Sequence, residues 1–203
     1  MTNREFDEQF RRRGAVLLGG IDEAGRGPLA GPVFAAAVIL DPARPVEGLN
    51  DSKKLSEAKR EALFDPIQEQ AVAWAVASAS VEEIEKYNIL GATFLAMRRA
   101  AEQLQPAAQL LLVDGNRMPP DLPVPARTIV KGDALSETIA AASILAKVSR
   151  DRYIMEVLDR QYPQYQFARH KGYGTKLHYA CLNEYGPCPA HRKTFLKKWE
   201  ARR

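Results

Sequence analysis

The sequence is poor in the residues that build disulfide-linked or membrane-embedded proteins. Its 203 residues include 2 cysteines, too few for a disulfide scaffold, and a reduced pair fits a cytoplasmic protein. No uninterrupted apolar segment approaches the roughly 18 residues that a membrane-spanning helix requires. Residues 1–13 are polar and charged, unlike a signal peptide. We therefore expect a cytoplasmic protein that does not associate with membranes.

The two cysteines suggest one alternative, a zinc site. His178-x-x-Cys181 and Cys188-x-x-His191 form a symmetric set of four potential zinc ligands. Their spacing is not a standard zinc spacing, and two prolines stiffen the segment between the pairs. Whether these residues bind a metal stays open at the level of the sequence.

The excess of positive over negative charge is also small, but the basic residues are unevenly distributed along the chain. The chain has 29 Lys and Arg against 25 Asp and Glu, a formal net charge of +4. Residues 191–203 contain six Lys and Arg, with Glu200 as their single acid and with Phe195 and Trp199 between the charges. Most such runs are solvated faces, yet basic residues interleaved with aromatic ones can also follow a phosphate backbone.

Hydrophobic periodicity predicts an α/β domain. Helices are expected after Ser56, with a kink near Pro66, after Ser80, with a turn at Asn88, and from Glu137 to about residue 160. The expected strands cover residues 15–21, 33–40, 71–79, 109–113 and 127–130. We expect a single domain overall, with a core in residues 1–162 and a C-terminal helical extension in residues 163–203 that packs on it.

The segment from Asp22 to Pro32 combines two consecutive acids with three glycines. Dinucleotide binding is one interpretation, but the glycine spacing and the two prolines fit poorly with a helix beginning there. A tight hairpin would explain the glycines and leave the acids merely solvated. A metal site that faces a polyanion gives both the carboxylates and the exposed backbone a role.

Three expected strands each end at a carboxylate: the first at Asp22 and Glu23, the fourth at Asp114 and the fifth, through Lys131-Gly132, at Asp133. Neighbouring strands lie about 5 Å apart, so acids at adjacent strand ends can share a divalent ion. Without a cation these carboxylates would raise one another's pKa. The oxygen ligands favour Mg²⁺.

Two points weaken this interpretation when each acid is considered alone. Consecutive side chains on a regular strand point to opposite faces, so Asp22 and Glu23 both reach a metal only if the strand bends there. Asp114 could be a turn residue, and Asp133 could be a helix cap. The joint arrangement is what points to a metal.

Six segments of the chain, in order, resemble bacterial ribonuclease HII, and together they span most of the sequence. They are DEAGRGPLAGP (22–32), NDSKKL (50–55), DGN (114–116), KGD (131–133), AASILAKVSRD (141–151) and HKGYGT (170–175). The glycine-arginine-glycine segment separates this family from ribonuclease HI, which shares only the carboxylate plan. The resemblance implies a ribonuclease H-like α/β fold, with a central mixed sheet flanked by helices and a C-terminal helical portion.

The resemblance also implies roles for individual residues. Asp22, Glu23, Asp114 and Asp133 match metal-binding, catalytic carboxylates that hold two Mg²⁺ or Mn²⁺ ions when substrate is bound. The residues expected to contact substrate are Gly25, Arg26 and Gly27, which read the ribose 2′-hydroxyl at an RNA to DNA junction, and Tyr173, which stacks on the following deoxyribose. The candidate phosphate contacts are Lys53, Lys147, Lys171, Arg192 and Lys193, any of which could simply be solvated.

One further acid in these segments is expected to be structural. Asp151 could be mistaken for a fourth carboxylate ligand, but it lies within Val148-Ser149-Arg150-Asp151 of the long helix. We expect it to form an ion pair there.

The implied function is that of a metal-dependent endoribonuclease. It would hydrolyse the RNA strand of RNA–DNA hybrids and incise duplex DNA 5′ to embedded ribonucleotides, as in ribonucleotide excision repair, leaving a 3′-hydroxyl and a 5′-phosphate. Its partners would be nucleic acids, and we expect a monomer. Two alternatives stay open: a noncatalytic hybrid-binding module with the same fold, and a ribonuclease HI-like activity that needs several consecutive ribonucleotides.

Overall fold

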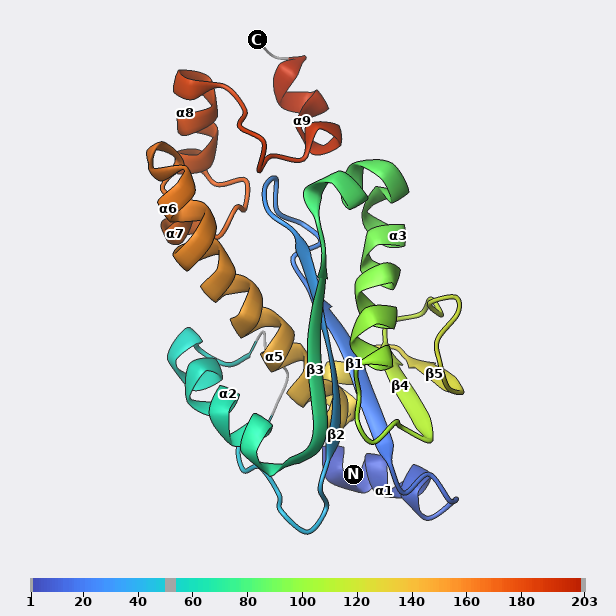
Figure 1. The fold of residues 1–203 in the computed structure, drawn as a ribbon. Helices are drawn as coiled ribbons and strands as arrows, with labels where there is room; N and C mark the ends of the chain where they lie inside the picture. Colours follow the sequence, from blue (N-terminus) through green and yellow to red (C-terminus); the bar gives the residue numbers. More distant parts are fainter. Residues whose placement is uncertain (1, 50–53, 202–203) are drawn as a thin grey trace.

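A five-stranded mixed sheet forms the centre of the protein, seen here in a computed structural model that describes residues 2–49 and 54–201 (Figure 1). The strands are β1 (Leu18–Ala24), β2 (Val33–Leu40), β3 (Ala71–Ala79), β4 (Leu110–Asp114) and β5 (Ala126–Ile129), in the order β3-β2-β1-β4-β5. The β1–β2 and β2–β3 pairs are antiparallel, whereas β1–β4 and β4–β5 are parallel. The mixed sheet predicted from the resemblance is confirmed.

Helices cover both faces of this sheet. The principal ones are α1 (Asn3–Arg11), α2 (Glu57–Gln70), α3 (Val81–Glu102), α4 (Gly132–Leu135), α5 (Glu137–Tyr153), α7 (Phe167–His170), α8 (Lys176–Tyr185) and α9 (Lys193–Glu200). Helix α3 packs on one face of β2 and β3, whereas α5 packs on β1 and β2 from the other side, with α2 beside it (Figure 1). No helix in the described ranges is both long and apolar enough to cross a bilayer.

Strand β2 shows how the sequence builds a core on each face of the sheet. Ala35 and Ile39 belong to the cluster that includes α3, whereas Ala36 and Val38 belong to the cluster that includes α5. Both sets are buried, so the strand reads as a continuous apolar run. Helix α5 lies so close to β1 that a Cβ atom on Gly20 would overlap the backbone of Thr138. This close approach matches the run of small residues in the first half of α5.

Most predicted elements agree with the structure, and the differences lie at their ends and breaks. The first strand begins at Leu18 rather than residue 15, and α2 runs through Pro66 as one continuous helix. The turn at Asn88 is confirmed: it interrupts α3 with φ 58°, and its side chain accepts hydrogen bonds from the N–H groups of Leu90 and Gly91. The long helix continues from α5 through a π-helical segment (Ile154–Leu158) into α6 (Asp159–Gln161).

Helix α1 was not predicted, although its signal is present. Thr2 and Glu5 form a capping box at its start, which a sequence pattern can reveal. The helix docks on α5 through the buried Asp7, which accepts hydrogen bonds from the Thr138 N–H at 2.9 Å and the Thr138 hydroxyl at 2.6 Å.

The C-terminal helices share a core with earlier parts of the chain. This cluster includes Tyr165, Phe167 and Leu182 from the C-terminal part, Leu29 from the segment after β1, and Ile154 from the long helix. Figure 1 shows these helices gathered at one end of the sheet. The division after residue 162 stays a prediction, because the shared core joins the two parts.

Candidate active site

Three acids from separate segments converge at one end of the sheet. Asp22 lies on β1, Asp114 ends β4 and Asp133 lies in α4, and potential ligand oxygens of the three lie within 4.8 Å of one another. The parallel pairing of β1 with β4 sets Ile21 beside Val113, so the residues that follow them are neighbours. The predicted convergence of these three acids is found in the structure.

The backbone around Asp133 holds this cluster together. Lys131 adopts a left-handed conformation (φ 58°) that turns the chain from β5 into α4. The Gly132 N–H then donates a hydrogen bond of 2.6 Å to Asp114 Oδ1. A Cβ atom on Gly132 would lie 2.5 Å from Ile139 Cδ1 and 3.2 Å from Asp114 Oδ1, so a larger residue would disturb this contact. The Lys-Gly pair therefore aligns two of the acids.

Asp22 is buried within the cluster and is 4% exposed, as is Asp133. Burial raises the pKa of Asp22 well above its usual range, and the charges of Glu23 and Asp114 raise it further. Hydrogen bonds from the Ser143 hydroxyl and the Glu23 N–H favour the charged carboxylate but do not cancel these effects. A divalent cation would relieve both the burial penalty and the repulsion, and three carboxylate oxygens are suitable ligands for a hard cation.

Glu23 lies outside this cluster. The bend that would bring both Asp22 and Glu23 to one metal is absent, because β1 continues in regular register with β2 as far as Ala24. Glu23 therefore lines a pocket of about 260 Å³ on the α3 side, together with Asp114 and Arg26. Glu23 is thus a neighbour of Asp114 but does not belong to the acid triad formed by Asp22, Asp114 and Asp133.

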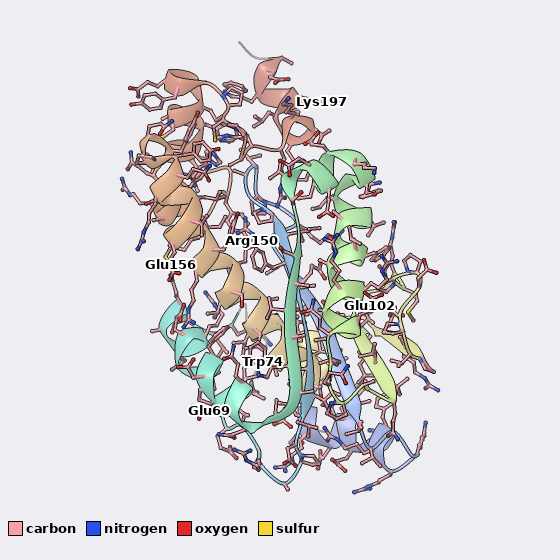
Figure 2. The ribbon with its side chains drawn as sticks, viewed as in Figure 1. Glu69, Trp74, Glu102, Arg150, Glu156 and Lys197 are labelled. Carbon is pink, nitrogen blue, oxygen red and sulfur yellow. The ribbon has the colours of Figure 1, made fainter. Side chains whose placement is uncertain are left out.

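Two buried arginines support the glycine-rich loop after β1. Arg192 donates to three carbonyl oxygens, those of Gly31 at 2.9 Å, Arg26 at 3.0 Å and Gly25 at 2.6 Å. Arg150 donates to the carbonyl oxygens of Ala30, Pro32 and Lys171 at 3.0 to 3.2 Å. Figure 2 shows Arg150 in the interior of the molecule.

Arg192 requires a correction. It was expected as a candidate phosphate contact, but its side chain is 0% exposed. Burial lowers the pKa of Arg192 to about 9, and the charge of Arg150 adds to this effect. Nothing in the basic C-terminal run distinguished it from its exposed neighbour Lys193.

The residues expected to contact substrate do lie together. A Cβ atom on Gly27 would have Tyr173 Cε1 as its nearest neighbour, at 3.9 Å, so this loop and the Tyr173 ring lie side by side. Tyr173 is 40% exposed. The Arg26 side chain is also exposed and lies 3.3 Å from Glu23. Arg26 thus lines the pocket with Glu23 and Asp114, and Gly27, one residue further on, lies beside the exposed Tyr173 ring.

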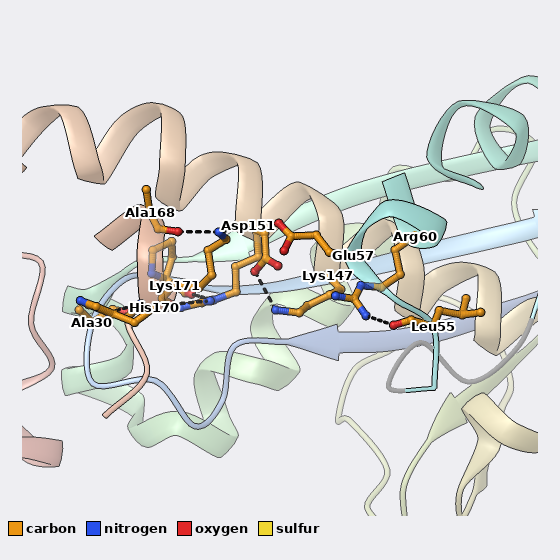
Figure 3. A network of polar contacts seen from close by, with 12 residues as sticks. Ala30, Leu55, Glu57, Arg60, Lys147, Asp151, Ala168, His170 and Lys171 are labelled. Carbon is orange, nitrogen blue, oxygen red and sulfur yellow. Dashed lines mark hydrogen bonds and ion pairs between the residues drawn. The ribbon is translucent and has the colours of Figure 1, made fainter. Parts of the chain in front are cut away.

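Two of the expected lysines, Lys147 and Lys171, are tied to neighbouring groups (Figure 3). Lys147 pairs with Asp151 at 2.8 Å, which confirms the predicted structural role of Asp151, and the Lys147 ammonium lies 5.6 Å from the centre of the Tyr173 ring. Lys171 donates to the Ala168 carbonyl oxygen at 2.6 Å and lies 3.8 Å from Glu57. Lys53 lies outside the described residues.

The alternative zinc site is not assembled in the described part of the chain. His178 Nε2 and His191 Nε2 lie 3.0 Å apart and hydrogen-bond each other. The converging group of potential metal ligands found among the described residues is the acid triad.

Sheet order, covering helices and converging acids together define a protein of the ribonuclease H type. The family model described as Ribonuclease HII matches residues 19–200, and the chain belongs to this family. The predicted fold class and the resemblance are confirmed. The family consists of metal-dependent endonucleases that act on RNA–DNA hybrids.

Individual relatives support this assignment. Ribonuclease HII of Albidiferax ferrireducens is 64% identical over 181 residues, which cover 89% of this chain and 86% of that protein. Ribonuclease HII of Chromobacterium violaceum is 60% identical over 188 residues, 92% of this chain and 94% of that protein. The crystal structure of ribonuclease H2 from Pyrococcus horikoshii matches with a TM-score of 0.72 at 27% identity, over 91% of this chain and 97% of that one.

Proposed function

We propose that this enzyme, besides acting on RNA–DNA hybrids, incises duplex DNA 5′ to a single embedded ribonucleotide and leaves a 3′-hydroxyl and a 5′-phosphate. The observation that carries the proposal is the position of the glycine-rich loop, which directly follows Asp22 and Glu23, shares a pocket with Asp114 through Arg26, and lies beside Tyr173. A loop with two glycines and an exposed arginine can approach a ribose closely. The aromatic ring next to it can stack on a neighbouring sugar.

The carboxylates would hold two divalent ions, Mg²⁺ or Mn²⁺. Asp22, Asp114 and Asp133 offer converging oxygens for one ion, and Glu23 offers a further carboxylate in the pocket that it lines with Asp114. When bound, such ions activate a water molecule and stabilise the leaving oxygen. Because water attacks, the 2′-hydroxyl is recognised and not consumed.

Substrate recognition would come from the protein's own groups. Arg192 binds the carbonyl oxygens of Gly25 and Arg26 from the interior of the protein. The solvent-facing side of the loop would therefore contact the ligand. The Lys147 ammonium lies beside the Tyr173 ring, and exchange of its partner Asp151 for a phosphate would bring it onto a nucleic acid backbone that passes there.

Two measurements test this function. Asp22→Asn should bind a duplex with one ribonucleotide as wild type does and lose cleavage in both Mg²⁺ and Mn²⁺. Asp65→Asn, which changes an exposed acid on α2, serves as the matched control and should cleave normally. Cleavage by Asp22→Asn at the wild-type rate would refute the central role of this carboxylate.

The substrate distinguishes the alternatives. Wild-type enzyme should cut duplexes with one and with four consecutive ribonucleotides. A requirement for four would indicate a ribonuclease HI-like activity, and tight binding without cleavage in either metal would indicate a noncatalytic module.

We also propose that the enzyme acts as a cytoplasmic monomer. All three converging acids come from one chain, so a second copy is not required to complete the triad. Sedimentation of the free protein and of its complex with one duplex would test the monomer.

A further inference from the structure

All three histidines of the chain lie in one buried cluster beneath Tyr173. His170, His178 and His191 are 6%, 0% and 2% exposed. The His170 and His178 rings stack with centroids 4.3 Å apart, and the His178 and His191 centroids are 5.1 Å apart. Phe167 packs edge-on against His178 and closes the cluster from the side.

The hydrogen bonds of the cluster assign the proton of each ring. His178 Nδ1 lies 2.9 Å from the Tyr173 carbonyl oxygen, which can only accept, so Nδ1 carries the hydrogen. In a neutral ring, His178 Nε2 must then accept, and His191 Nε2, at 3.0 Å, is the donor. His191 Nδ1 is left to accept from the Cys188 N–H at 3.0 Å. In each of these three hydrogen bonds the donor lies on the Cys188 side and the acceptor on the Tyr173 side, and both imidazole rings are neutral.

The backbone segment that carries Tyr173 is also held by His170, on the side of Gly172. His170 Nε2 donates to the Tyr165 carbonyl oxygen at 2.9 Å, and its Nδ1 accepts from the Gly172 N–H at 3.2 Å. The Gly172 carbonyl in turn accepts from the Leu29 N–H at 2.8 Å. The backbone on both sides of the Tyr173 side chain is therefore fixed to histidines.

The histidine pair also reaches the glycine-rich loop. His191 is followed by Arg192, whose guanidinium holds the carbonyl groups of Gly25 and Arg26. A single path therefore connects the Tyr173 carbonyl, His178, His191 and Arg192 with the loop. The two elements that would contact the ribose and the next deoxyribose depend on the same buried pair.

We infer that His178 and His191 are positioning residues that set Tyr173 at a fixed place relative to the loop of Gly25 to Gly27, so that the enzyme recognises an RNA to DNA junction. This inference rests on the proposed function. It predicts a selective effect, because only a substrate with a deoxyribose after the ribonucleotide uses the stacking on Tyr173.

Two substitutions of His178 separate its two hydrogen bonds. His178→Asn keeps an amide donor near the position of Nδ1, for the Tyr173 carbonyl. His178→Gln keeps an acceptor near the position of Nε2, for His191, and loses the bond to Tyr173. For a duplex with one ribonucleotide, we expect His178→Gln to raise KM about tenfold. The increase should be much smaller for a uniform RNA–DNA hybrid, and His178→Asn should fall between His178→Gln and wild type.

A double-mutant cycle with Tyr173→Ala completes the test. If His178 acts through Tyr173, adding His178→Gln to Tyr173→Ala should change KM for the single-ribonucleotide duplex less than about twofold. Glu184→Gln, an exposed change on the same helix, is the control. Should His178→Gln fail to fold, His191→Gln in the same cycle serves instead.

Three results would overturn the inference: equal loss on both substrates, independent effects in the cycle, or stoichiometric zinc that is bound by wild type and lost in His178→Gln. Failure of the proposed function looks different, because wild type itself would then leave the single-ribonucleotide duplex intact.

Discussion

Replacing Gly25 with alanine tests whether the glycine-rich loop is shaped by the arginine beneath it. Gly25 has φ 96°, and a Cβ atom there would overlap Nε and Cδ of the buried Arg150. A left-handed backbone costs an L-residue about 1–2 kcal/mol, and forcing a packed side chain aside costs about 1–3 kcal/mol. We therefore expect Gly25→Ala to lower the free energy of unfolding by about 2–5 kcal/mol, a large part of the total for an ordinary domain.

Gly27→Ala provides the matched comparison. The nearest atom to a Cβ there is Tyr173 Cε1 at 3.9 Å, an ordinary contact. Urea unfolding of both variants should show a lower midpoint for Gly25→Ala at an unchanged slope, and little change for Gly27→Ala. If the two variants unfold within about 0.5 kcal/mol of each other, the loop is not held against Arg150 as described.

Three further predictions concern the buried charges. Asp22→Asn should raise the melting temperature in metal-free buffer. Burial and the neighbouring acids raise the pKa of Asp22, which means that its negative charge destabilises the fold. A lower melting temperature of the variant by calorimetry in EDTA would refute this. Burial lowers the pKa of His178 and of His191 from 6.5 to about 4, so the unfolded chain binds these protons first as pH falls. Stability should decline between about pH 6.5 and pH 4, by up to about 3 kcal/mol per histidine, and urea unfolding should show a shallower decline for His178→Gln. Arg192→Lys cannot keep three carbonyl contacts and should lose about 2–4 kcal/mol in the same assay, whereas Lys193→Ala, an exposed neighbour, should match wild type.

The acid triad could be predicted because its pattern is local. Asp22 and Asp114 each come at the end of an apolar run, and neighbouring strands in a sheet bring such positions together. The place of Glu23 could not be predicted in the same way. Whether a strand bends at its last residues depends on its partner, and here β2 keeps β1 regular as far as Ala24.

The supports of the glycine-rich loop left no comparable pattern in the sequence. Arg150 and Arg192 donate to backbone carbonyl groups, which every residue carries, so no particular side chain signals the contact. The histidines were noticed, but as potential zinc ligands, since spacing does not reveal that two rings face each other. Only the fold brings residues so distant along the chain into hydrogen-bonding distance.

The dependence of the glycine-rich loop on Arg192 has a consequence for synthesis on the ribosome. A nascent chain that has emerged as far as residue 162 already contains all three converging acids, yet it lacks the guanidinium that holds Gly25 and Arg26. The surface proposed to select substrate is therefore the last to be completed. On the proposed function, a chain cut short before Arg192 would keep its carboxylates and lose its selection of RNA to DNA junctions.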